Sequence, residues 1–164
     1  MKQIAFFIML VSYATVVSSS PDITFHGNLI APPTCIVSEH IVSENKTIEI
    51  AFNEVIISDI SGDNYKREVP YSVECDSENT DTGIQMKLTW TGVETDFNDS
   101  AVETDVVGLG VELQQNGQRF QQGKAINISK TNLPKLHAVL VKKSGAVLSE
   151  GAFEAYATLQ VDYQ

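Results

Sequence analysis

The stretch GAFEAYATLQVDYQ, residues 151–164, decides the fold. From Gly151 onward every second residue is glycine or an apolar side chain, and the positions between are mostly polar. This period of two predicts a β-strand with one buried face, about 43 Å long at roughly 3.3 Å per residue. The buried face comprises Gly151, Phe153, Ala155, Ala157, Leu159, Val161 and Tyr163. Since no residues follow Gln164 to supply a strand beside this one, we expect its partner to come from elsewhere.

The rest of the chain also has the pattern of short strands separated by turns, without a helical stripe. Polar, glycine-containing stretches at Asn116-Gly117 and Gln122-Gly123 predict turns, and four acidic residues between 96 and 105 predict a solvated loop. The expected strands lie at residues 47–52, 69–75, 83–93, 106–113 and 136–141. About seven strands in one domain favour an all-β sandwich.

The first residues have the features of an export signal. Lys2 precedes an apolar run, residues 4–17, that is too short to span a bilayer. Small residues follow it, so we expect cleavage after Ser18 or Ser19 and a signal peptide of residues 1–19. A buried N-terminal helix is the alternative.

A second alternating stretch, residues 20–31, precedes the Pro32-Pro33 pair. Its apolar face contains Ile23, Phe25, Gly27 and Leu29. A glycine within a strand often marks the close approach of another backbone. The stretch is therefore predicted to be a strand ahead of the domain of residues 32–164, with an ordinary first strand of its own sandwich as the alternative.

The chain contains two cysteines, Cys35 and Cys75. Export leads into an oxidising compartment, where we expect them to form a disulfide. Closing a loop of about 40 residues contributes roughly 4 kcal/mol on the loop-entropy estimate. Two separate buried thiols are the alternative, and no histidine has metal-ligand spacing to either cysteine.

Acidic residues outnumber basic ones by 21 to 11, which gives a formal net charge of -10 at pH 7. Such a chain offers no basic surface to nucleic acid, so no nucleic-acid partner is expected. His26, His40 and His137 are expected at the surface or in turns. No nucleophile lies in a recognisable local motif. We therefore predict no enzymatic activity, catalytic residue, metal ion, cofactor or small-molecule substrate.

These features together resemble the chaperone–usher pilin family, in particular minor subunits of type 1 and P-type pili. The similar features are the segment ITFHGNLI before the first cysteine, the cysteine spacing, REVPYSVEC before the second cysteine, and GLGVELQQNGQRF. The family's C-terminal signature is a glycine fourteenth from the end and a penultimate aromatic residue, matched by Gly151 and Tyr163. The resemblance extends over essentially the whole mature chain.

The resemblance implies an incomplete immunoglobulin-like β-sandwich that lacks its final strand and is completed by donor-strand complementation. Ile23, Phe25, Gly27 and Leu29 would be donated, and Gly151 to Tyr163 would border the groove that receives a strand. It also implies that basic residues of a chaperone anchor the carboxylate of Gln164.

The function expected from this resemblance is that of a structural subunit of a surface pilus, or fimbria, of a Gram-negative bacterium. Its expected partners are a periplasmic pilus chaperone, an outer-membrane usher, and neighbouring pilin subunits or an adhesin. The short N-terminal extension and acidic charge favour a minor tip or adaptor subunit supporting adhesion. The main alternative is a self-contained secreted immunoglobulin-like binding module. A two-domain adhesin would need a longer chain.

Overall fold

The computed structural model describes residues 35–39, 47–75 and 86–163, all within the compact unit Pro32–Gln164. A short 3-10 turn, η1 (Ile57–Asp59), is the one helical element in these ranges. The strands are β1 (Cys35–Glu39), β2 (Arg67–Glu68), β3 (Tyr71–Cys75), β4 (Met86–Gly92), β5 (Glu94–Thr95), β6 (Asn98–Glu103), β7 (Leu109–Gln115), β8 (Gln118–Arg119), β9 (Ile126–Ile128), β10 (Leu136–Lys142) and β11 (Ala157–Tyr163).

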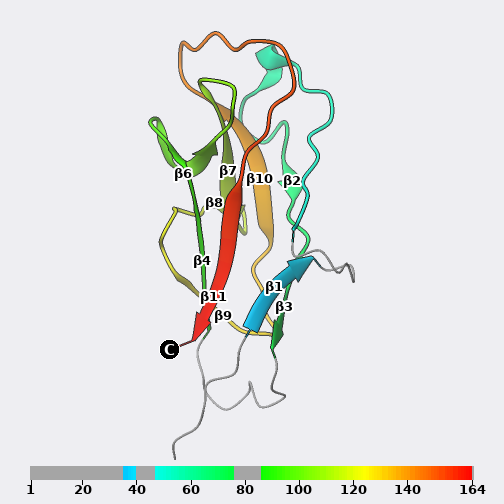
Figure 1. The fold of residues 1–164 in the computed structure, drawn as a ribbon, viewed down its shortest axis with the longest axis vertical. Coiled ribbons are helices and arrows are strands. Elements are labelled where there is room, and N and C mark those ends of the chain that lie inside the picture. The colour runs from blue at the N-terminus through cyan, green and yellow to red at the C-terminus, as the bar shows by residue number, and fades with distance from the viewer. Residues whose placement is uncertain (1–34, 40–46, 76–85, 164) are drawn as a thin grey trace, which may run out of the picture. The chain divides into compact units, whose positions relative to one another are not determined.

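The described strands form three antiparallel sheets (Figure 1). The largest has the order β2-β10-β7-β6-β5, with β8 beside β7. The second has the order β11-β4-β9, and the third is the pair β1-β3. Within the described ranges no helix has the length and apolar character needed to cross a membrane. The predicted all-β class is confirmed.

Strand β4 shows how the alternating sequence builds the core. Met86, Leu88 and Trp90 are buried, while Lys87 and Thr89 between them are only half-buried. The Nε1 atom of Trp90 donates a 2.8 Å hydrogen bond to the carbonyl oxygen of Phe120, and the two ring centroids lie 6.3 Å apart. This bond satisfies the one polar atom of a fully buried indole.

The segment leading to the second cysteine changes sheets at Val69-Pro70. The N–H of Val69 donates to the carbonyl oxygen of Leu136, next to the β2–β10 ladder. Pro70 has no N–H to donate, so the ladder is interrupted there. After this break Tyr71 begins β3, which pairs with β1.

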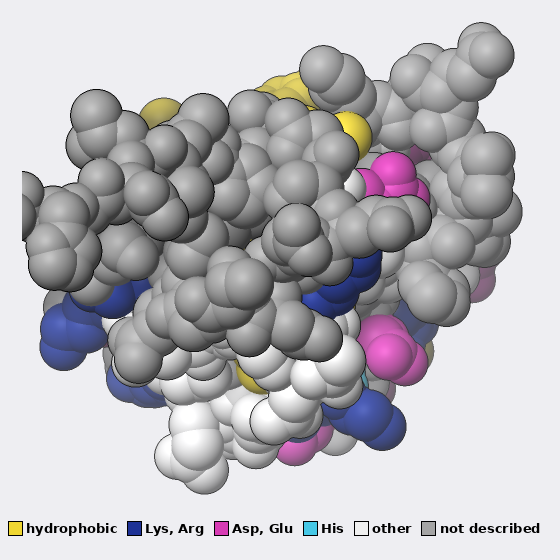
Figure 2. Space-filling view, turned by 90° about the horizontal axis from the view of Figure 1, so that it is seen from below, with side chains coloured by type: hydrophobic (Ala, Val, Ile, Leu, Met, Phe, Trp, Pro, Cys, Tyr) yellow, Lys and Arg dark blue, Asp and Glu magenta, His cyan; other side chains and the backbone are white. Residues whose placement is uncertain are grey.

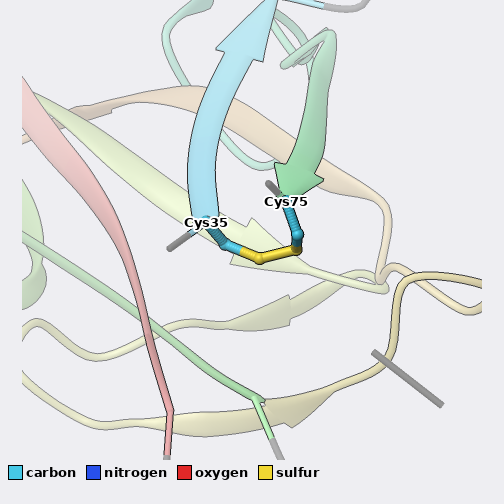
Figure 3. The surroundings of a disulfide bond; sticks show 2 residues. All are labelled: Cys35 and Cys75. Carbon is cyan, nitrogen blue, oxygen red and sulfur yellow. A yellow bond between two sulfur atoms is a disulfide. The ribbon is translucent and has the colours of Figure 1, made fainter. Parts of the chain in front are cut away.

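The predicted disulfide is confirmed. Cys35 and Cys75 are directly opposite each other in the β1–β3 ladder, with 4.1 Å between their Cα atoms (Figure 3). The bridge therefore joins two strands that are already paired by backbone hydrogen bonds.

The predicted turn at Asn116-Gly117 is also confirmed. Both residues have positive φ, 47° and 78°, and they connect β7 to β8. Asparagine followed by glycine suits such a tight hairpin because both tolerate the left-handed region.

Other expectations about strands were wrong. The acidic stretch predicted as a loop, residues 96–105, contains β6, although its carboxylates at positions 96, 99, 103 and 105 are exposed as expected. Residues 47–52, predicted as a strand, join no ladder with described residues. Strand β7 begins at Leu109 rather than at residue 106, because Val106 to Leu109 forms a turn with Gly108 at φ 84°.

His137 lies within β10 and is half-buried, not in a turn. Its Nδ1 atom is buried without a hydrogen-bond partner among the described residues. Across the described ranges no three His, Cys, Asp or Glu side chains gather as a metal site. Figure 2 shows the molecule from below the view of Figure 1, and both basic and acidic side chains of the described residues reach the surface there.

Candidate strand-binding groove

Among the described strands, β11 is paired along one edge and has no ladder along the other. It pairs with β4 from Ala157↔Gly92 to Tyr163↔Met86. In the described part of the chain no strand pairs with its second edge. Strand β1 comes within 8 Å of β11 between Cα atoms without forming a ladder with it. An edge of this kind presents backbone N–H and C=O groups to an incoming strand.

The segment Thr47–Phe52 has the exposure of a strand but lacks its ladder. Ile48 and Ile50 are half-buried, Phe52 is 7% exposed, and the residues between them are exposed. Its side chains pack on the core while its backbone pairs with no described strand. Among the described residues, Thr47–Phe52 therefore pairs with no strand, and β11 pairs with a strand along one edge only.

A pocket of about 540 Å³ lies between the chain before η1 and the chain leading to β11. Its walls include Ile50 and Phe52 on one side and Leu148 and Phe153 on the other. The rings of Phe52 and Phe153 have centroids 5.9 Å apart. Apolar side chains on both walls line the pocket, so it suits an apolar side chain.

Glu54 and Glu150 also line this pocket. Both residues are exposed. They place negative charge around the opening of the pocket.

The structure places the predicted groove residues as follows. Phe153, Ala155, Leu159 and Val161 are half-buried and pack against the core, whereas Gly151 and Ala157 are exposed. Tyr163 ends β11, and its side chain is outside what the structure describes, as is Gln164. Ile23, Phe25, Gly27 and Leu29 also lie outside the described residues, together with the predicted signal peptide, His26 and His40.

Gly151 has a conformational role at the start of this segment. Its φ is 146°, a value that L side chains rarely adopt, and no atom lies within 4 Å of where a Cβ would be. Glycine is therefore required at this position by the backbone conformation and not by a lack of space for a side chain.

The residues between Gly151 and β11 are held by the side chain and the backbone of Asp105 instead of by a ladder. The N–H of Glu154 donates to Oδ1 of Asp105 at 2.8 Å, and the N–H of Asp105 donates to the carbonyl oxygen of Glu154 at 3.2 Å. Sequence reasoning missed this role of Asp105, because exposed acidic residues are usually only solvated.

The exposed Tyr156 lies on the outer side of the same segment. Its hydroxyl donates a 2.6 Å hydrogen bond to Oε2 of Glu154. This hydrogen bond, with the negative charge of Glu154, raises the pKa of Tyr156. The segment before β11 is thus anchored through Asp105, while Phe153 lines the pocket.

Comparison with known proteins places this geometry in a family. The family model for fimbrial proteins matches residues 23–164. The chain belongs to the fimbrial protein family. Relatives in Escherichia coli K12 are the uncharacterized fimbrial-like proteins YfcQ, 50% identical over 160 residues, and YfcR, 30% identical over 161 residues. The alignments cover 96% of both this chain and YfcQ, and 93% of this chain and 87% of YfcR.

Solved pilus structures share the fold of this fimbrial protein. The P pilus rod subunit PapA matches with a TM-score of 0.57 and 21% identity, over 87% of this chain and 100% of PapA. A subunit of a chaperone–usher pilus matches with a TM-score of 0.53 and 22% identity, over 93% of this chain and 100% of that subunit. The predicted immunoglobulin-like pilin fold is confirmed.

Family membership also decides the general role. Fimbrial proteins are structural subunits of surface pili of Gram-negative bacteria, so the predictions of a pilus subunit and of no enzymatic activity are confirmed. The resemblance to chaperone–usher pilins is confirmed as well.

Proposed function

We propose that this fimbrial protein is polymerised by donor-strand exchange, with the free edge of β11 as the acceptor. The proposal rests on two segments with backbone groups that lack a neighbouring strand in the described part of the chain. Among the described residues, β11 has one edge without a ladder, and Thr47–Phe52 is an extended, core-packed segment without a ladder. A strand added beside β11 would satisfy the backbone groups of that edge.

The donor in this proposal is the segment of residues 20–31 of another subunit, with Ile23, Phe25, Gly27 and Leu29 directed into the groove. A complete immunoglobulin-like sheet is antiparallel, so the donor runs antiparallel to β11. In that direction Leu29 lies at the pocket beside Phe153, and Ile23 lies toward Val161.

The expected gain in free energy is large enough for a stable joint. Burying the side chains of Ile23, Phe25 and Leu29 contributes about 1.5 to 3 kcal/mol each, or roughly 5 to 9 kcal/mol together. This range is an upper bound because free chains already bury some apolar surface. Without a donor, the same apolar groove would favour aggregation.

The need to cover the groove before assembly is the physical reason for a chaperone. We propose that the chain crosses the periplasm after loss of residues 1–19, and that a periplasmic chaperone lends a strand to β11. Basic chaperone residues would anchor the carboxylate of Gln164. An outer-membrane usher would then exchange the chaperone strand for the next subunit's extension, residues 20–31 ahead of the domain of residues 32–164. The acidic charge and short extension favour a minor tip or adaptor subunit.

A peptide experiment tests acceptance of the strand. Mature protein is refolded with an excess of a labelled peptide of residues 21–31 or of the same peptide carrying Gly27→Leu. We expect a one-to-one complex with the first peptide and at least tenfold weaker binding of the second, because a leucine side chain replaces hydrogen where two backbones approach. A refolded monomer that binds neither peptide would instead support a self-contained module.

A second experiment tests donation in cells. Gly27→Leu, or deletion of the residues before Ala31, should leave chaperone binding intact and stop linkage between subunits. The readout is the polymer ladder on a gel run without heating. A normal ladder from the deletion variant would contradict the donor role.

A further inference from the structure

Two nearly fully exposed valines lie at the pocket end of the groove. Val107 is 91% exposed and Val147 is 95% exposed. Val106, which precedes Val107, lines the pocket, and so does Leu148, which follows Val147. We call Val107 and Val147 the valine pad. Isolated exposed valines are ordinary, but this pair adjoins an apolar pocket on two neighbouring turns.

The two turns that carry the valine pad are fixed against each other. The N–H of Lys143 donates to the carbonyl oxygen of Gly108 at 2.9 Å. A Cβ atom added to Gly108 would lie 2.8 Å from Cβ of Ala146, so the turns are packed closely there. Val107 precedes this contact and Val147 follows it. The backbone next to each valine is therefore held in place by this contact between the turns.

We infer that the valine pad binds the segment Ile30–Pro33 of a second copy of this chain. The inference rests on the proposed function, because it takes the donor to run antiparallel to β11 with Leu29 in the pocket. The donor chain then leaves the groove at its pocket end, where Val107 and Val147 lie.

The sequence after Leu29 fits this surface. It reads Ile30, Ala31, Pro32 and Pro33, without a charged side chain. Pro32 and Pro33 have no N–H, so they cannot continue a ladder and must pack by apolar contact. Six residues from Leu29 to Cys35 span at most about 20 Å. The donor's folded domain therefore starts close to the pad.

The charges of the two surfaces are also compatible. Glu54 and Glu150 line the pocket. Within residues 21–34 the one carboxylate side chain is Asp22. In the antiparallel direction Asp22 enters at the opposite end of the groove, so no carboxylates are brought together at the pad.

Peptides of two lengths separate this inference from the proposed function. The mature full-length chain is refolded with a labelled peptide of residues 21–29 or of residues 21–33, and dissociation is followed with an excess of unlabelled peptide. We expect the longer peptide to dissociate roughly tenfold more slowly, which corresponds to the burial of about one valine side chain. The shorter peptide should reach the pocket and not the pad.

Substitution of the pad completes the test. In the variant Val107→Ser with Val147→Ser, the two peptides should dissociate at rates within about twofold of each other. Val93→Ser, at a valine that is 68% exposed and absent from the pocket lining, should keep the tenfold difference. The shorter peptide should behave alike on all three proteins.

The outcomes are distinguishable. Equal dissociation of the two peptides from the unsubstituted protein, or a tenfold difference that survives in the pad variant, would overturn the role of the valine pad and leave donor-strand exchange standing. Binding of neither peptide would overturn the proposed function itself.

Discussion

The ring of Phe52 lies 5.9 Å from that of Phe153, centroid to centroid, at an interplanar angle of 42°. The two residues belong to segments that share no backbone ladder, so this side-chain contact connects the two walls of the groove at its pocket end. A donor strand placed between the walls would pack its apolar side chains near both rings. The contact between the two rings therefore contributes both to the stability of the groove and to its binding of a donor strand.

Phe153→Ala is expected to weaken binding of the donor peptide. The side chain is half-buried, so its loss should cost about 2 kcal/mol, or roughly thirtyfold in the dissociation constant. The measurement is titration of the refolded protein with the peptide of residues 21–31. Phe97→Ala, at another half-buried phenylalanine that does not line the pocket, is the control. Equal losses in both variants would show that Phe153 has no particular role in the groove.

The sequence predicted which side chains face inward more reliably than which residues form a ladder. In the C-terminal stretch, Phe153, Leu159 and Val161 pack on the core as the period of two required. The ladder nevertheless begins only at Ala157, because β4 ends at its partner Gly92 and Asp105 holds the backbone of Glu154 instead. Alternation is a property of one segment, whereas pairing depends on where another segment ends.

The hairpin of β5 and β6 was missed for a different reason. Ser100, Ala101 and Val102 are three consecutive buried residues, so β6 does not show a period of two. Its exposed carboxylates gave the pattern of a loop. The groove's second wall, Thr47–Phe52, alternated visibly, but nothing in its sequence indicated that it packs beside Phe153 without joining a ladder with described residues.

Removal of the disulfide should destabilise the domain without abolishing its strands. Replacing Cys35 and Cys75 together by serine removes a bridge across a sequence separation of 40 residues. The expected loss in the free energy of unfolding is about 4 kcal/mol. Denaturant unfolding of the protein in complex with the donor peptide measures it.

Mass spectrometry of secreted material checks the same region chemically. The mature chain should begin at Ser19 or Ser20 and contain no free thiol. Two free thiols, or a retained Met1, would contradict the prediction.

The stability of the domain should depend on pH through Tyr71. This side chain is 9% exposed, and its hydroxyl donates a 2.7 Å hydrogen bond to the carbonyl oxygen of Pro134. Burial raises the pKa of Tyr71 from 10.0 to about 12. Below pH 10 the hydroxyl is protonated in both the folded and unfolded states. Between pH 10 and 12 the unfolded state loses its proton first, so the free energy of unfolding falls as pH rises, by about 2 to 3 kcal/mol in total.

Tyr71→Phe isolates this contribution. At pH 8 the variant should be about 1 kcal/mol less stable, because it lacks the hydrogen bond to Pro134. Its free energy of unfolding should fall less steeply than that of the unsubstituted protein between pH 10 and 12. Parallel pH profiles for the two proteins would show that Tyr71 does not ionise differently on folding.

The two faces of β11 should respond oppositely to substitution. Val161 is half-buried and packs against the core, opposite Leu88 of β4, while Asp162 is exposed and opposite Lys87. Val161→Ser should lose about 1 to 2 kcal/mol of stability in the complex with a donor strand, because it removes apolar contact on the groove side. Asp162→Asn should change stability by less than about 0.5 kcal/mol, because exposed charges on a strand contribute little. Co-purification with the periplasmic chaperone compares the two variants in the cell, and the Val161 variant should be recovered in lower yield.

Extension of the chain past Gln164 by a charged tag should abolish the complex, since the added residues displace the terminal carboxylate that the chaperone is proposed to anchor. A tagged protein that stays soluble and monomeric without the chaperone would show that β11 needs no added strand.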